Sequence, residues 1–126
     1  MIINLNSNSE EKIDVVSLQK ETMESMKEYI EKLLPEFEKM VPELRTNILE
    51  DTWEYLRMMI DGFNWVLEAY NGTSSVINVD GCIDEGKVQK SVDDLGNAFI
   101  NKDAENVAKS IEDGVIPFLE SIYKKL

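Results

Sequence analysis

The sequence predicts a mainly α-helical fold, an up-and-down antiparallel bundle of about four helices in a single domain over residues 1–126. Over most of the chain, apolar residues recur at intervals of three and four, which is the period of one helix face. The length of 126 residues suits one domain, and the 43% apolar content can fill one core. The connections between the helical segments are short, which favours antiparallel neighbours.

Residues 1–16 leave two structures open. Short β-prone runs at 2–5 and 13–16 flank a polar segment over 6–11. This pattern suits a short N-terminal β-hairpin, but an isolated hairpin is only marginally stable in water, so a frayed arm is the alternative.

Two helices are expected over residues 17–71. Ser17 is a candidate N-cap for the first, and Pro35 is expected to kink it or divide it near Leu34. Its apolar stripe comprises Met23, Met26, Ile30, Leu33, Phe37 and Met40. Pro42 suits the first turn of the second helix, and Asn71-Gly72 suits its end. The second stripe comprises Leu49, Trp53, Leu56, Ile60, Phe63, Leu67 and Tyr70.

The remaining residues predict a loop over 72–83 and two further helices over 84–126. Within the loop, Asp80-Gly81 favours a tight turn. The third helix is marked by Val88, Val92, Leu95 and Phe99. A turn at 101–103 follows, with Asp103 placed to cap the fourth helix. The fourth stripe comprises Ala104, Ala108, Ile111, Val115, Phe118 and Ile122. Gly114 and Pro117 are expected to bend or loosen its middle.

The charge and composition of the chain exclude several partners. The formal charge is −12 and the acidic excess is spread along the chain, so no basic stripe is present to bind nucleic acid or an anionic membrane. No apolar run approaches the length of a membrane span, and no export signal is visible at the N-terminus. Cys82 is the only cysteine, so an intramolecular disulfide cannot form. A cytoplasmic location is therefore expected.

The absence of histidine argues against an enzyme. It removes nucleophilic triads, histidine proton shuttles and most zinc and di-iron motifs. We expect Cys82 to be a partly buried structural thiol. The acidic clusters Glu50-Asp51-Glu54, Asp93-Asp94 and Glu112-Asp113 lie off the apolar stripes and are expected to be solvated. No catalytic residue, cofactor, metal ion or small-molecule ligand is inferred.

The second helix is more apolar than one buried stripe requires. Between Tyr55 and Tyr70 its polar residues form one narrow stripe, Arg57, Asp61, Asn64 and Glu68. Such a helix is usually buried among several neighbours, so a central core helix is one interpretation. The other is that part of this helix faces outward for a partner or a second copy, because Met and Trp suit contact surfaces. The candidate interaction residues are Tyr55, Met58, Gly62 and Trp65.

Two segments carry a family resemblance. They are Asp61-Gly62-Phe63-Asn64-Trp65-Val66 and the ending that runs through Lys102-Asp103 to Ser110-Ile111-Glu112-Asp113-Gly114-Val115-Ile116-Pro117-Phe118-Leu119-Glu120. Together they resemble a family of small uncharacterised helical-bundle proteins of Gram-positive bacteria, a domain of unknown function. The chain departs from that pattern at Gly114, where a Glu is expected. The resemblance implies a helical fold and assigns no functional residue.

The sequence thus favours a non-enzymatic protein-interaction or adaptor module that self-associates or binds another protein through the second helix. Two alternatives stay open. One is an export-chaperone-like binder of a helical client, which would need a groove for an apolar helix. This alternative rests only on the acidic helices and the size of the chain, which is an analogy at the level of the fold. An enzyme that uses carboxylates with a divalent metal would need acids that converge in a pocket.

Overall fold

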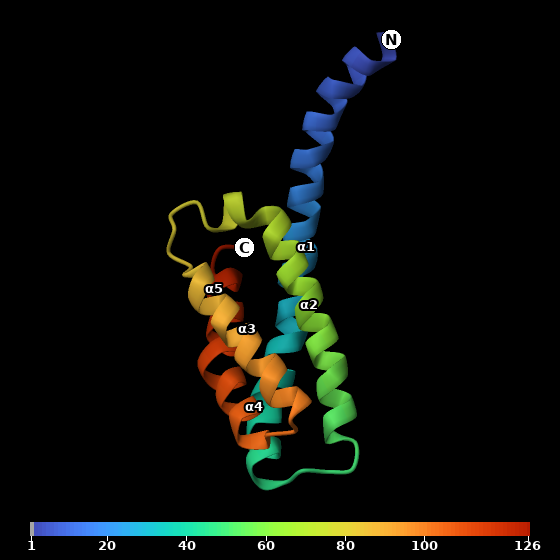
Figure 1. The fold of residues 1–126 in the computed structure, drawn as a ribbon. Coiled ribbons are helices and arrows are strands. Elements are labelled where there is room, and N and C mark those ends of the chain that lie inside the picture. The colour runs from blue at the N-terminus through green and yellow to red at the C-terminus, as the bar shows by residue number, and fades with distance from the viewer. Residues whose placement is uncertain (1) are drawn as a thin grey trace.

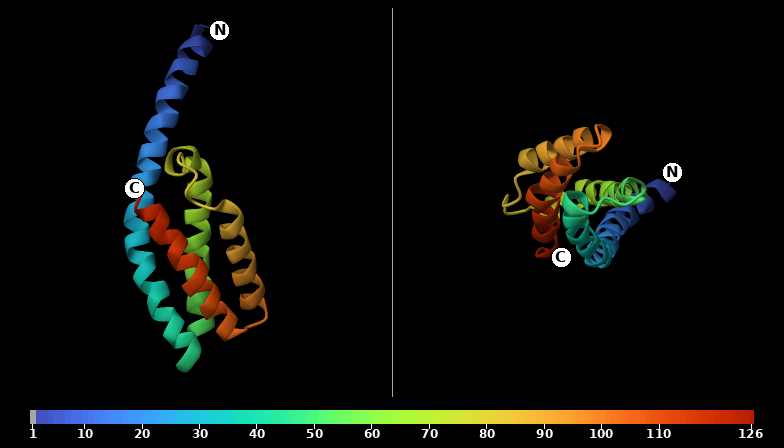
Figure 2. Two further views of the ribbon diagram at one scale, coloured as in Figure 1. Left: turned by 90° about the vertical axis from the view of Figure 1, so that its left-hand side faces the viewer. Right: turned by 90° about the horizontal axis from the view of Figure 1, so that it is seen from below.

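The computed structural model describes the backbone of residues 2–126 and the side chains of residues 16–126. Every regular element in that range is helical, so the predicted mainly α fold is confirmed. Four helical rods run alternately up and down (Figure 1). They are α1 (Ile2–Thr46), α2 (Thr52–Ile77), α3 (Glu85–Ile100) and a last rod formed by α4 (Ala104–Ser110), η1 (Ile111–Val115) and α5 (Ile116–Tyr123). The last rod packs against both α1 and α3, and α2 packs along α1 (Figure 2).

The β-hairpin considered for residues 1–16 does not form over the described residues 2–16, and Ser17 is not a helix cap. Residues 2–16 are the first part of α1, which projects beyond the other helices as an arm (Figure 1). A helix that already exists gains one backbone hydrogen bond for each added residue. A two-stranded hairpin would need its own nucleation and has no third strand to support it.

Neither proline divides α1, although Pro35 was expected to kink the helix or divide it near Leu34. Pro35 lies inside the helix, and Pro42 lies near its end instead of starting the second helix. Both prolines are exposed, so each missing backbone donor lies on the solvent side. The predicted stripe from Met23 to Met40 is buried from Met26 onward, with Met23 partly buried, and it continues to Leu44. Burial of that last apolar residue extends the helix to Thr46.

The bounds of α2 also differ from those predicted. It begins at Thr52, whose buried hydroxyl donates to a Glu43 carboxylate oxygen at 2.9 Å and accepts from the Leu49 amide at 2.7 Å. Leu49, expected in the core, is 49% exposed in the connection before the helix. Asn71-Gly72 does not end α2, because Thr73 and Ile77, one and five residues after Gly72, are buried.

The loop that was predicted over 72–83 is therefore shorter and runs from 78 to 84. Its turn is organised by Asn78, whose side chain accepts from the Ile83 amide at 2.8 Å and donates to the Ile83 carbonyl at 3.0 Å. Gly81 adopts a φ of 70°, which favours glycine, and the predicted turn is confirmed. A hydrogen bond from Lys125 ties Asp80 to the C-terminus and lowers the pKa of Asp80 to about 2. Cys82 is exposed, so the expectation of a partly buried thiol is wrong.

The predicted α3 and last rod are confirmed in outline. Asp84 and Asp103 cap α3 and α4, and Asp103 accepts from the Asn106 amide at 3.3 Å. The last rod changes to a π-helical turn at η1, which contains Gly114, as expected from a loosened middle. A Cβ on Gly114 would lie 2.5 Å from the Ser91 Cβ, so this glycine lets α3 and η1 approach closely.

A column of aromatic rings joins three of the rods. Phe63 of α2 packs edge-to-face on Phe37 of α1, with ring centroids 6.0 Å apart, and on Phe118 of α5 at 6.3 Å. Phe118 in turn contacts Tyr70 at 5.4 Å. Edge-to-face contacts add to the free energy that these rings gain from burial. The column therefore fixes which face of α2 points inward.

We predict that Gly114→Ala destabilises the protein by about 1–3 kcal/mol, because the added methyl group overlaps Ser91 and forces α3 away from η1. Gly96→Ala is the matched control, since Gly96 is exposed in α3 and its Cβ would contact nothing within 4 Å. That control should gain about 0.5–1 kcal/mol from helix propensity. Urea unfolding measures both values, and equal shifts for the two variants would contradict the close approach.

We predict that the Tyr70 hydroxyl stabilises the fold below pH 10 and ceases to do so at higher pH. Burial and a 2.9 Å hydrogen bond to Glu85 raise the pKa of Tyr70 from 10.0 to about 12. Between these values the unfolded state releases its proton first, so the free energy of unfolding falls as the pH rises. Tyr70→Phe should cost about 1 kcal/mol at neutral pH, and this cost should fall to zero and then reverse between about pH 10 and about pH 12. A cost that is independent of pH in urea unfolding would refute the linkage.

Candidate interaction surface

Three of the four candidate interaction residues lie at the surface of α2. Tyr55 is 43% exposed, Met58 65% and Trp65 42%. With Gly62 they follow spacings of three and four, so they share one face of the helix. That face adjoins α1, because Tyr55 and Trp65 both contact α1 side chains. We call the exposed Tyr55, Met58 and Trp65, with Tyr29 of α1, the seam surface.

Gly62 contributes to this surface by leaving space. A Cβ on Gly62 would overlap the hydroxyl of Tyr29, so the glycine lets the Tyr29 ring lie across α2. Tyr29 then packs edge-on against Trp65, with centroids 5.5 Å apart and planes at 80°. Gly62 itself is half-buried. The sequence identified Gly62 as a candidate interaction residue but did not identify Tyr29, whose position depends on how α1 and α2 are aligned.

Tyr55 is held at the seam by α1. Its hydroxyl donates to a Glu36 carboxylate oxygen at 2.5 Å, and this hydrogen bond raises the pKa of Tyr55. The ring is therefore fixed in place while almost half of its surface stays accessible. A pre-positioned aromatic side chain loses little conformational freedom when a partner covers it.

A shallow hollow of about 450 Å³ lies beside Trp65. It is lined by Ser25, Glu28, Tyr29 and Lys32 of α1 and by Trp65 of α2. The hollow combines aromatic faces with charged groups at its edge. This arrangement can accept an apolar side chain from a partner while polar groups at its rim remain hydrated.

The remaining apolar residues of α2 account for its unusual composition. Both Met59 and Val66, outside the predicted stripe, are buried with Leu56, Phe63 and Tyr70. Trp53, Ile60 and Leu67 are partly buried against the core. The helix thus buries a wide arc and exposes Met58 and Trp65. Its predicted polar stripe, Arg57, Asp61, Asn64 and Glu68, is exposed.

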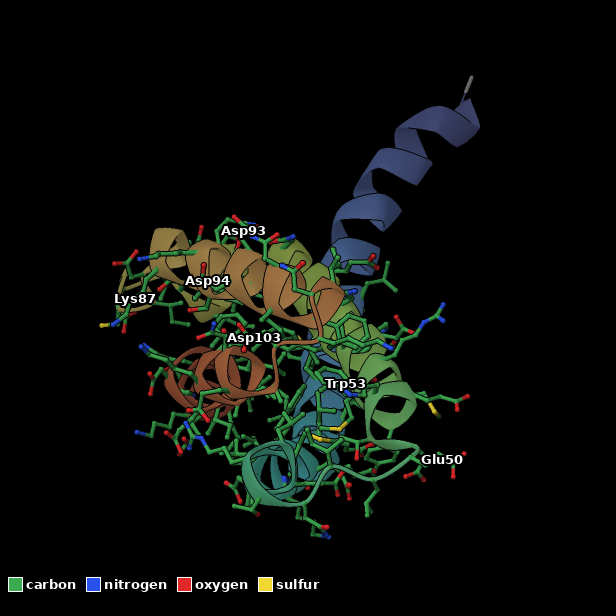
Figure 3. The ribbon with its side chains drawn as sticks, turned by 60° about the horizontal axis from the view of Figure 1, so that its bottom comes forward. Glu50, Trp53, Lys87, Asp93, Asp94 and Asp103 are labelled. Atoms are coloured by element: carbon green, nitrogen blue, oxygen red, sulfur yellow. The ribbon has the colours of Figure 1, made fainter. Side chains whose placement is uncertain are left out.

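The acidic clusters that a carboxylate enzyme would need do not converge on one site. Figure 3 shows Glu50 in the α1–α2 connection, directed away from the bundle, and Asp93 on the outer side of α3. Glu112 is engaged by Arg45 at 3.2 Å, and Arg45 also contacts Glu105. Among the described side chains, no group of three or more acids or cysteines is arranged to hold a metal ion. These contacts suit solvated or structural acids.

A second hollow of about 530 Å³ lies between α3 and the last rod. Its walls carry charges of both signs, from Lys90, Asp94, Lys109 and Asp113, alternating with asparagine and serine side chains. Two lining residues are labelled in Figure 3: Asp94 lies on α3, and Asp103 directly precedes α4. In the part of the chain with described side chains, no buried polar side-chain atom lacks a hydrogen-bond partner.

A protein-family model matches most of the chain. The family model described as "Domain of unknown function (DUF8042)" matches residues 21–125, which cover the bundle and leave out the α1 arm of residues 2–16. No curated protein and no solved structure matches the chain. The resemblance to a domain of unknown function is thus confirmed, while the Gram-positive origin stays a prediction. Within the described residues, no helix combines the length and the apolar character needed to cross a membrane.

We predict that Gly62→Ala alters the emission of Trp65, because the methyl group displaces the Tyr29 ring that packs on the indole. A Trp53→Phe background isolates the Trp65 signal. Tyr29 can rotate outward, so the change in stability should stay within about 1 kcal/mol. Gly72→Ala is the control, since its Cβ would meet nothing within 4 Å in the same helix. Identical spectra for the two variants would show that Tyr29 does not depend on Gly62.

Proposed function

We propose that this chain, which belongs to the DUF8042 family, is a non-enzymatic protein-interaction or adaptor module whose binding site is the seam surface. The exposure of Met58 and Trp65 beside the Tyr29 hollow is the observation that carries the proposal. Large apolar side chains with accessible surface gain free energy when a partner covers them. Tryptophan and tyrosine are also enriched among the residues that dominate binding energy.

The construction of the surface supports this proposal. Tyr29 and Tyr55 are held by contacts between α1 and α2, so the aromatic groups are presented by two packed helices. Sites on rigid helices keep their geometry better than sites on loops. Met58 lies between Tyr55 and Trp65 on α2, and its flexible thioether side chain can adapt to a partner.

The chemistry of the chain supports a role without catalysis. The chain contains no histidine, and its acidic clusters are exposed, separated or engaged in ion pairs. An interaction module needs only an accessible apolar surface with a polar rim. Its partner would be a second protein or a second copy of this chain.

We predict that Met58→Asp abolishes the capture of specific partners, because a carboxylate at this position would be desolvated in the complex. Ile100→Asp is the matched control, since Ile100 is an apolar residue of α3, 77% exposed and outside the seam surface. Affinity capture from the native host followed by quantitative mass spectrometry compares the two variants with the wild type. Proteins retained equally by all three would show that the seam surface is not the binding site.

A further inference from the structure

We propose that the occupant of the seam surface is a basic amphipathic helix of a partner protein. This inference rests on the proposed function and names the class of partner. Its observation is a row of acids, Glu54, Asp61 and Glu68, that runs along the seam surface on α2. All three are exposed and follow one another at intervals of seven residues.

The acidic row alternates with the apolar anchors. Glu54, Met58, Asp61, Trp65 and Glu68 follow spacings of 4, 3, 4 and 3, so they occupy one helix face. Successive acids are separated by about 10.5 Å along the helix axis. A partner helix that covers Met58 and Trp65 therefore passes beside a carboxylate at every second turn.

The α1 side of the seam surface adds further negative charge. Glu28 lines the hollow beside Trp65, and Glu21 lies seven residues earlier on the same exposed row of α1. Lys32 also lines the hollow, and Arg57 stands beside the acidic row on α2. Glu36, which accepts from Tyr55, also lies at the seam surface. With Glu54, Asp61 and Glu68 of α2, six acids thus face two bases along this part of the surface.

A helix is the secondary structure that best fits this surface. The seam between two antiparallel helices offers a groove into which a third helix can pack its ridges. Apolar side chains at intervals of three and four on such a helix would reach Met58, Trp65 and the Tyr29 hollow. Lysine or arginine at flanking positions seven residues apart would meet the acidic row. The net charge of −12 would also speed the encounter with a basic partner.

The same charges disfavour a second copy as the occupant. A two-fold dimer that packs α2 against α2 would bring both acidic rows to one interface. Arg57 is the only base of α2 and cannot neutralise three carboxylates on each copy. Like charges at an interface suppress the wrong partner, so this surface suits a protein of opposite charge.

The test uses synthetic amidated helices of about five turns. One peptide carries leucine at intervals of three and four, with lysine at the flanking positions. Its two counterparts replace every lysine by glutamate or by glutamine. Fluorescence anisotropy with the full chain measures each affinity. We expect the lysine peptide to bind, its affinity to fall as salt is added, and both counterparts to bind at least about tenfold more weakly.

Two variants of equal net charge separate the effect of the acidic row on binding from the effect of the overall negative charge. The first combines Glu54→Gln, Asp61→Asn and Glu68→Gln. The control combines Glu38→Gln, Asp94→Asn and Glu120→Gln, which are exposed acids outside the seam surface. Circular dichroism checks that both remain folded. The row variant should bind the lysine peptide about tenfold more weakly than the control variant, and Met58→Asp should not bind it measurably.

Four results would overturn the inference: no binding of the lysine peptide, equal binding of the glutamate or glutamine peptide, equal loss in both charge variants, or a dimer in sedimentation that Met58→Asp dissociates. The last would make a second copy the occupant and leave the proposed function intact. The proposed function itself fails only if partner capture from the host is indifferent to Met58→Asp. The two failures are therefore distinguishable.

Discussion

The packing of Phe63 between Phe37 and Phe118 is the constraint on which the rest of the structure depends. It joins α1, α2 and α5 through one buried ring. Because Phe63 must point inward, the helix period places Met58 and Trp65 toward the outside. The core contact and the exposed surface are thus two results of the same rotation of α2. A change in that rotation would move both together.

The apolar spacing predicted the helices well where burial follows a regular stripe, as in α3 and the last rod. Local signals failed where tertiary burial outweighed them. Pro42 resembles a helix start, yet burial of Leu44 keeps the residues around it in α1. Asn71-Gly72 resembles a helix stop, yet Thr73 and Ile77 pack into the core and extend α2. A stop signal costs about 1 kcal/mol, whereas burying one large apolar side chain gains more.

The candidate surface could be predicted only in part. An excess of apolar residues on one helix pointed to Met58 and Trp65, since a single stripe could not bury all of them. Tyr29 and the hollow could not be found in this way, because they arise from the alignment of two helices far apart in the sequence. Two acids of the row, Asp61 and Glu68, were visible as part of a polar stripe, and Glu54 was visible in an acidic cluster. The meaning of the row depends on Met58 and Trp65 being exposed beside it.

The π-helical turn at η1 also has a consequence for changes in chain length. This turn accommodates an extra residue and still delivers Val115, Phe118 and Ile122 to the core. Gain of a further residue there would rotate everything that follows by about 100° and carry Phe118 out of the aromatic column, whereas loss of one residue would restore the regular α-helix and keep Phe118 in place. Connections at 47–51 and 78–84 face no such constraint. Among related chains, we therefore expect insertions to collect in these connections and to avoid 111–115, where only the loss of one residue preserves the register.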